Sequence, residues 1–191
     1  GGGVLDRTFF KEPVTDVGLE IGFGAGEHLV WQAEAHPGMG WIGCEPYRHG
    51  VASLLARWPE AARGRLRVVV DDARVLLAAL PDACLGRAFV LFPDPWPKKR
   101  HHRRRVVQPE TLRQLARVLR PGAELRLATD DVEYGRWILA LALRESGLEW
   151  LAERADDWRQ RGADWPETRY EAKALAAGRK CLYLRFRRCP G

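Results

Sequence analysis

Acidic side chains recur in this sequence where short apolar runs end. Glu20 lies at the end of the first run, and Glu45, Asp72 and Asp94 follow the next three. A carboxylate can accept hydrogen bonds from ribose hydroxyls, from the edge of a base or from a cationic group. One acid after a strand is ordinary turn chemistry, but four in succession predict a shared ligand site.

The most unusual stretch begins at Phe92 and reads FPDPWPKKRHHRRR. Proline lacks the N–H that a strand ladder needs, so the chain is expected to leave the sheet after Phe92. Asp94 and Trp96 would then lie beside the basic run Lys98–Arg105 at the carboxyl edge of a sheet. A carboxylate, an indole and a cationic run suit a planar group that is carried on a polyanion.

A glycine-rich loop follows the first apolar run and contains Gly22, Gly24 and Gly26. Glycines at such a turn let the backbone approach a ligand and leave helix N–H groups free. The spacing G-x-G-x-G differs from the G-x-G-x-x-G of dinucleotide sites, which disfavours a nicotinamide oxidoreductase. Glu20 would repel a pyrophosphate here, whereas it would attract the amino or sulfonium group of S-adenosylmethionine.

Apolar runs and amphipathic stretches alternate along most of the chain. They predict a single-domain, Rossmann-like α/β fold with a mostly parallel sheet and helices on both faces. We expect this domain to span residues 16–191, after a short N-terminal segment, 1–15, in which Gly1–Gly3 is interpreted as a linker remnant. The expected strands are 16–21, 39–45, 66–70, 88–92, 123–128, 148–151 and 180–187, and the expected helices are 27–35, 48–58, 75–80, 109–119 and one from Asp131 to about Ser146. Residues 152–179 are polar and mixed, and no element is assigned to them.

Composition limits the class of protein. The chain has 191 residues, of which 46% are hydrophobic, so one domain with a substantial core is expected. Much of the net charge of +6 lies in Lys98–Arg105, which favours a nucleic-acid partner over a merely solvated loop. Four widely spaced cysteines without metal-ligand spacing predict reduced thiols, no metal and a cytoplasmic protein. The sequence has no apolar run of membrane-spanning length and no signal peptide, so no membrane partner is expected.

Six strings, LEIGFGAGEHL, GCEPY, DDA, FPDPWPKKRHHRRR, LATDD and TRYEAK, together resemble the bacterial tRNA (guanine-N7)-methyltransferases. The resemblance extends from about Leu19 to Phe186, and the fourth string is its most specific part. It implies a class I methyltransferase fold, S-adenosylmethionine as cofactor and tRNA as partner. It also implies methylation of N7 of a guanine in the tRNA variable loop. The sequence leaves open whether the protein is a monomer or a homodimer.

The resemblance implies residue roles, position by position. The cofactor would be bound by the glycine loop and the four acids, and Asp94 would also be the catalytic residue. Three departures from the family pattern are the short segment before Val17, the proline at Pro97 and the loose match at Cys44–Tyr47. The implied substrate contacts are Lys98, Asp130, Thr168, Arg169, Tyr170 and Glu171.

Guanine N7 carries an in-plane lone pair and no proton, so its methylation requires no general base. Catalysis then depends on in-line positioning and on electrostatics. We expect the Asp94 carboxylate to bind the N1–H or amino edge of the guanine and to stabilise the positive charge that builds on the purine. The alternative for Asp94 is a residue that only forms the turn between two prolines.

Other side chains have two interpretations each. Trp96 would stack on a flipped-out guanine or would pack as a core or lid tryptophan. His101 and His102 are expected to face phosphate or solvent, because the reaction removes no proton from N7. Glu171 would hold the substrate or would form a local ion pair with Arg169.

Two competing functions remain open from the sequence. The first is methylation of another base nitrogen, since Asp94-Pro95-Trp96 has a faint likeness to the [DNS]-P-P-[FYW] loop of amino-methylating enzymes. The second is a non-catalytic RNA-binding module with a relict cofactor loop. The identity of the methylated base distinguishes the first, and binding of S-adenosylmethionine distinguishes the second.

Overall fold

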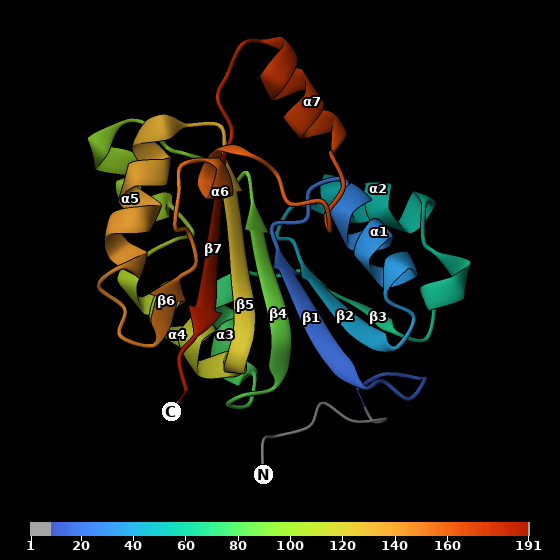
Figure 1. Ribbon diagram of the computed structural model, residues 1–191. Helices are drawn as coiled ribbons and strands as arrows, with labels where there is room; N and C mark the ends of the chain where they lie inside the picture. The colour runs from blue at the N-terminus through green and yellow to red at the C-terminus, as the bar shows by residue number, and fades with distance from the viewer. Residues whose placement is uncertain (1–8, 191) are drawn as a thin grey trace.

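The computed structural model describes residues 9–190, so the Gly1–Gly3 segment lies outside the described residues. Residues 9–190 form a seven-stranded sheet with helices on both of its faces (Figure 1), which confirms the predicted α/β fold. The strands are β1 (Asp16–Ile21), β2 (Met39–Cys44), β3 (Leu66–Val69), β4 (Leu85–Leu91), β5 (Leu119–Thr129), β6 (Leu148–Trp150) and β7 (Leu182–Arg188). The helices are α1 (Glu27–Ala35), α2 (Arg48–Ala56), α3 (Ala73–Ala79), α4 (Pro109–Val118), α5 (Val132–Ala142), α6 (Asp156–Arg159) and α7 (Arg169–Ala176), with 3-10 turns η1 (Glu60–Ala62) and η2 (Lys99–Arg104).

The sheet has the order β3-β2-β1-β4-β5-β7-β6. Strands β1 to β5 are parallel, whereas β7 runs antiparallel to both β5 and β6. The strand order reverses between β1 and β4, and ligands of open α/β sheets bind beyond the carboxyl ends of the strands at such a switch point. Glu20 pairs in register with Phe89, so the glycine loop after β1 begins beside the proline-rich loop after β4.

Two apolar cores occupy the two faces of the sheet. Helices α1 and α2 cover one face, where Leu29 and Leu54 pack in a cluster with Phe89. Helices α3, α4 and α5 cover the other, where Leu115 and Ile138 belong to a second cluster. Strands buried on both faces explain the continuous apolar runs in the sequence.

Strand β5 begins at Leu119, earlier than the predicted residue Ala123. Helix α4 ends at Val118, and Pro121 and Gly122, which were expected to end it, lie within this strand. Leu119 pairs with Leu85, and the register between β4 and β5 shifts after that pair. The irregularity allows the strand to contain a proline, because the ladder is already interrupted there.

The unassigned segment 152–179 contains two helices, α6 and α7. Helix α7 lies beyond the carboxyl edge of the sheet in Figure 1, and β7 then returns through the sheet. The side chain of Thr168 caps α7 by accepting a hydrogen bond from Glu171 N at 3.2 Å. This N-cap is the local signal that starts the helix.

Candidate functional site

The glycine loop has a backbone that only glycine adopts easily. Gly22, Gly24 and Gly26 have φ angles of 69°, 55° and 82°, all in the left-handed region. A Cβ atom at Gly26 would also lie 2.6 Å from the side chain of Leu54, whereas one at Gly22 or Gly24 would meet no atom within 4 Å. The first two glycines are therefore required by backbone conformation, and their outer side is open to a ligand.

Glu45 connects the glycine loop to the end of β2. Its buried carboxylate accepts hydrogen bonds from Gly24 N and from Tyr47 N, each at 3.0 Å. Gly50 allows this close approach, because a Cβ there would lie 2.5 Å from Gly24 O. The structure thus places Glu45 at the loop with a fixed orientation, as a ribose-binding acid requires.

Glu20 is 3% exposed and points toward helix α1. Its Oε2 lies 2.9 Å from His28 Nδ1, and the Nε2 of the same ring lies 3.1 Å from Gln32 Nε2. The His28 ring packs edge-on against Phe89 with ring centroids 4.4 Å apart. Sequence reasoning missed His28 and Gln32, although their separation by four residues would have placed both on one face of the helix.

Asp72 ends the segment after β3 and caps helix α3. It accepts a hydrogen bond from Arg74 N at 2.8 Å and forms an ion pair with the Arg74 side chain. The hydrogen bond from Arg74 lowers the pKa of Asp72, so this carboxylate is ionised at neutral pH. A base edge bound at Asp72 would share the carboxylate with Arg74.

Asp94 is exposed in a loop with two unusual backbone conformations. Phe92 and Trp96 have φ angles of 50° and 43°, which are rare for residues with side chains. The loop is attached to β5 where Phe92 N donates to Ala128 O at 2.7 Å. Positive φ at such residues persists only where surrounding contacts enforce it, and it is concentrated at functional sites.

The basic run after this loop is divided by burial. Residues 98–100 and 103–104 are exposed, partly within η2. Arg105 is 1% exposed, so the prediction that the whole run binds phosphate is wrong for this residue. Its guanidinium is enclosed by two aromatic rings of helix α5, Tyr134 and Trp137, which lie about thirty positions later in the sequence.

Trp96 belongs to neither of the two apolar cores. Trp96 is partly buried, and the Arg104 guanidinium lies 5.0 Å from its ring centroid. The His101 ring lies edge-on to Trp96 at 6.0 Å. His102 does not face solvent freely, because it packs edge-on against Trp137 with centroids 5.3 Å apart. Trp96 is therefore not a core residue, and both the lid role and stacking on the guanine stay predictions.

Asp130 follows β5 and faces two residues from the C-terminal part of the chain. It accepts a hydrogen bond from Arg179 Nε at 2.7 Å, and the Tyr170 hydroxyl lies 3.3 Å from both of its carboxylate oxygens. The Tyr170 ring packs against Phe92 with centroids 5.2 Å apart. Burial and the nearby Asp130 raise the pKa of Tyr170. The structure therefore brings Tyr170 and Asp130 together beside the Asp94 loop.

Arg169 contacts the beginning of helix α1. Its backbone N donates to Glu27 Oε2 at 2.8 Å, and its guanidinium forms an ion pair with the same carboxylate. Glu27 is the first residue of α1 after the glycine loop. Helix α7 thus starts at the glycine loop and presents Tyr170 to the end of β5.

Glu171 is buried, and the predicted ion pair with Arg169 is wrong. Its carboxylate accepts hydrogen bonds from Arg161 Nε at 3.0 Å and from the Tyr183 hydroxyl. Burial and the hydrogen bond to Glu171 raise the pKa of Tyr183. Successive helical residues point in different directions, which separates Glu171 from Arg169.

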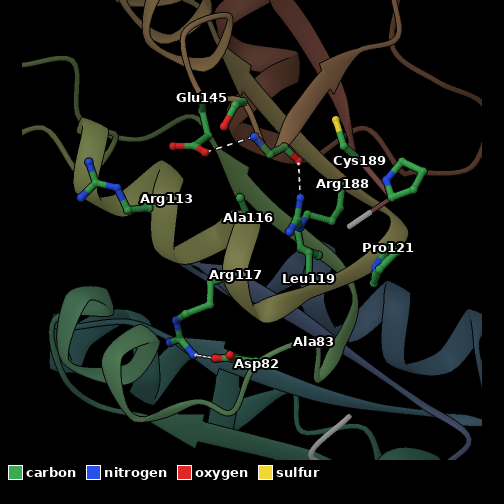
Figure 2. A pocket seen from close by; sticks show the side chains of 13 residues that line it. Asp82, Ala83, Arg113, Ala116, Arg117, Leu119, Pro121, Glu145, Arg188 and Cys189 are labelled. Atoms are coloured by element: carbon green, nitrogen blue, oxygen red, sulfur yellow. Dashed lines mark hydrogen bonds and ion pairs between the residues drawn. The ribbon is translucent and has the colours of Figure 1, made fainter. Parts of the chain in front are cut away.

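A cavity of about 540 Å³ lies at the opposite edge of the sheet (Figure 2). Its charged side chains are already engaged: Arg117 pairs with Asp82, and Arg188 donates to Gly147 O at 3.2 Å. None of the predicted site residues lines it. The glycine loop and the Asp94 loop therefore remain the candidate site.

A membrane-spanning helix and a metal-binding cluster are both absent from residues 9–190. No helix in this range has both the length and the apolar character to cross a bilayer. The same residues hold no group of three or more histidine, cysteine or acidic side chains arranged to bind a metal ion. The polar groups around the glycine loop are carboxylates and backbone groups. Carboxylates accept hydrogen bonds and attract positive charge, which suits a cationic nucleoside such as S-adenosylmethionine.

Comparisons with known proteins identify relatives of this chain. The family model described as "Putative methyltransferase" matches residues 15–184. The tRNA (guanine-N(7)-)-methyltransferase of Rhodospirillum rubrum is 54% identical over 184 residues, covering 96% of this chain and 72% of the relative. The protein of the same name from Ruegeria pomeroyi is 57% identical over 173 residues, covering 91% of this chain and 73% of the relative.

A solved structure supports the fold independently. The crystal structure of the 16S rRNA methyltransferase KamB has a TM-score of 0.62 at 18% sequence identity, and the match covers 93% of this chain and 89% of that chain. Similarity at this level shows a shared class I methyltransferase fold, and the two named relatives show the family. The chain belongs to the tRNA (guanine-N7)-methyltransferase family.

Proposed function

We propose that this protein transfers the methyl group of S-adenosylmethionine to N7 of a guanine in the variable loop of tRNA. The observation that carries the proposal is the position of Asp94. The exposed carboxylate follows β4, next to the glycine loop of β1, and an exposed basic segment comes directly after it. Family membership supports the same reaction. We also propose that the reaction takes place in the cytoplasm and that the enzyme is a monomer or homodimer.

The cofactor is proposed to bind along the carboxyl ends of β1, β2 and β3. When bound, S-adenosylmethionine supplies an electrophilic methyl group on a sulfonium centre. Glu45, held by Gly24 N, would accept hydrogen bonds from the ribose, and Asp72 would reach the adenine edge. Glu20 is buried against His28, so its carboxylate contributes negative potential at the loop more readily than a direct contact.

The guanine is proposed to bind between the Asp94 loop and the Asp130 turn. The Asp94 carboxylate would bind the N1–H or amino edge of the base, and this interaction strengthens as positive charge develops on the ring. Trp96 would stack on the extruded base from the same loop. Tyr170 and Asp130 would form the opposite wall, because they already contact each other beside Phe92.

The tRNA backbone is proposed to bind the exposed residues of the basic segment, 98–100 and 103–104. Lys98 is exposed and immediately follows the Asp94 loop. Arg169 and Thr168 would contact the substrate or the cofactor from the start of α7. Glu171 would support the substrate site without contacting the substrate, because its carboxylate already accepts hydrogen bonds from Arg161 and Tyr183.

Nucleoside mass analysis tests the proposal directly. The protein is incubated with unmodified tRNA and S-adenosylmethionine, the RNA is digested, and 7-methylguanosine is measured. Formation of 7-methylguanosine is the expected result. A base methylated on another nitrogen would contradict the proposal and would favour the amino-methylating alternative. Absence of product together with failure to bind S-adenosylmethionine in a titration would instead favour a non-catalytic RNA-binding module.

A further inference from the structure

Arg105 differs from the other basic residues of the segment in its environment. The side chain of Arg105 has no exposed surface, although it belongs to a run of cationic residues at the molecular surface. Burial of a guanidinium is unfavourable unless its N–H groups and its charge are satisfied. Its contacts therefore indicate a function that phosphate binding does not explain.

The Arg105 guanidinium bridges two structural elements. Nε donates to Pro95 O at 2.7 Å, and the terminal nitrogens form an ion pair with Glu133 of helix α5. The ring centroids of Tyr134 and Trp137 lie 4.7 and 4.9 Å from its Cζ atom. One side of the guanidinium thus holds the Asp94 loop, and the other sides are fixed to α5.

The backbone around Arg105 is attached to the same helix. Trp137 Nε1 donates to Val107 O at 3.0 Å, and Val107 N donates to the Tyr134 hydroxyl at 3.3 Å. The anchor of Arg105 on α5 therefore consists of backbone and side-chain contacts together. Such an anchor is rigid, which a group that positions another residue requires.

The hydrogen bond to Pro95 O acts on the most unusual peptide of the loop. The Pro95 carbonyl belongs to the peptide bond that precedes Trp96, whose φ of 43° is in the left-handed region. A hydrogen bond to that carbonyl fixes the peptide plane and so enforces the strained conformation. The same contact determines the direction in which the adjacent Asp94 leaves the loop.

Arg105 also connects the two proposed walls of the guanine site. Helix α5 is capped by Asp131, which directly follows Asp130 and accepts a hydrogen bond from Tyr134 N at 2.7 Å. Tyr134 in turn contacts the Arg105 guanidinium. A continuous path of packed groups therefore joins the Asp130 turn to the Asp94 loop.

We propose that Arg105 is a positioning residue of the methyl-transfer site, which holds the Asp94–Trp96 loop against helix α5 through Pro95 O. The inference rests on the proposed role of Asp94. Arg105 does not touch the substrate, and it sets the place from which Asp94 and Trp96 meet the base. Methyl transfer is sensitive to such placement, because a displacement of about 1 Å can lower a rate by about 100-fold.

The test compares Arg105→Lys with the matched variant Arg103→Gln, which changes an exposed residue of the same segment. Lysine keeps the charge but lacks the planar fork that serves Pro95 and Glu133 together. We expect Arg105→Lys to lower kcat about 10- to 100-fold with KM for tRNA within about twofold. Arg103→Gln should raise KM for tRNA and weaken its dependence on salt. If Arg105→Lys instead changes KM and the salt dependence alone, Arg105 is a phosphate ligand and the proposal is wrong.

Hydrogen exchange gives a readout that does not depend on turnover. In Arg105→Lys the amides of Asp94, Trp96 and Lys98 should exchange faster, whereas the β1 and β2 amides should be unchanged. Unchanged exchange in the loop overturns the positioning role, even if activity falls. If the wild type makes no 7-methylguanosine but the loop still loosens in the variant, the proposed function fails while the anchoring by Arg105 stands.

A second variant covers the case in which Arg105→Lys does not fold. Glu133→Gln removes the negative charge that pairs with Arg105, so the buried Arg105 guanidinium is left without a carboxylate partner. Faster exchange of the loop amides and a lower kcat at unchanged KM are expected. A folded Glu133→Gln protein with wild-type exchange and kcat overturns the proposal.

Discussion

Arg169 forms an ion pair with Glu27, although the two residues are 142 positions apart in the chain. Glu27 begins the helix after the glycine loop, and Arg169 begins helix α7. The pair therefore fixes the start of α7 to the proposed cofactor side of the site. From there the helix carries Tyr170 to Asp130.

Glu27→Gln should lower the stability of the protein slightly and in a pH-dependent manner. Burial raises the pKa of Glu27, but the hydrogen bonds and charge of Arg169, with Arg57, lower it to a net value below the ordinary 4.5. A depressed folded-state pKa adds stability above pH 4.5 that is lost as the pH falls through the folded pKa. The Glu27 side chain is 25% exposed and that of Arg169 is 71% exposed. Because the pair is partly solvated, we expect its loss to lower the free energy of unfolding by only about 0.2–1 kcal/mol at neutral pH.

Thermal melts across a pH series measure this effect. The difference in Tm between wild type and Glu27→Gln should be largest near neutral pH and should shrink in acid. Glu34→Gln, an exposed change on the same helix, serves as the control and should leave Tm unchanged. A Tm difference that grows as the pH falls would contradict the assigned ion pair.

Asp94→Asn should remove most activity without removing the cofactor site. The amide keeps the size of the side chain but cannot stabilise positive charge on the base, and loss of one such group costs about 100- to 1,000-fold in kcat. Single-turnover formation of 7-methylguanosine measures the change, with S-adenosylmethionine affinity measured by calorimetry. Glu149→Gln, on the exposed face of β6, is the control. Near-normal turnover by Asp94→Asn would leave this residue with only a turn-forming role.

Replacing Lys98, Lys99, Arg100 and Arg103 by glutamine should weaken tRNA binding first. Each phosphate contact that is lost should reduce the slope of log K against log salt by about 0.7–0.9. At saturating tRNA, kcat should stay close to that of the wild type, because these side chains are proposed to bind phosphates and not the reacting base. Filter binding at several salt concentrations measures the slope. Full tRNA affinity at low salt would show that the basic segment has another partner.

Glu45→Gln should weaken binding of S-adenosylmethionine. The carboxylate is buried and accepts two backbone hydrogen bonds, so its charge acts on the ligand from a fixed position. Loss of charge-assisted hydrogen bonds is worth about 1.5–3 kcal/mol, which corresponds to about a 10- to 100-fold rise in Kd. Calorimetric titration measures the change. Asp72→Asn should have a smaller effect, because that carboxylate is more exposed and is shared with Arg74.

Glu171→Gln should affect stability more than substrate binding. The carboxylate joins Arg161 to Tyr183 in the interior, and loss of its charge should lower the free energy of unfolding by about 1–3 kcal/mol. For a protein of this size, a fall in Tm of about 2–4 °C per kcal/mol is expected. Differential scanning calorimetry and steady-state kinetics test this together. A raised KM for tRNA at unchanged Tm would instead support the direct substrate contact predicted from sequence.

The parallel part of the sheet and the positions of its loops could be predicted from sequence, because both depend on local patterns. The apolar run of β1 and the three glycines after it are specified by neighbouring residues alone. The acids Glu45 and Asp94 are likewise placed by the ends of their strands. Parallel strands bring these ends to one edge, which is why the candidate site could be identified from spacing.

The parts that could not be predicted depend on contacts between distant residues. Arg105 stands in a cationic run, and its burial depends on Tyr134 and Trp137, which lie about thirty residues later. Glu171 is buried because Tyr183 of β7 reaches it. Helix α7 lies in a polar stretch with a weak periodicity, so the cap at Thr168 was its only strong local signal.

Strand β7 pairs with both β5 and β6, and α7 comes shortly before it in the chain. Ribosomes extend a chain at about 5–20 residues per second, and its N-terminal part emerges first. Strands β1 to β4 therefore emerge before β7. A partly synthesised chain therefore has the glycine loop and the Asp94 loop but lacks Tyr170 and Arg179 against Asp130. The proposed site is therefore assembled in two stages during synthesis, with the parallel strands first and the contacts of Tyr170 and Arg179 with Asp130 afterwards.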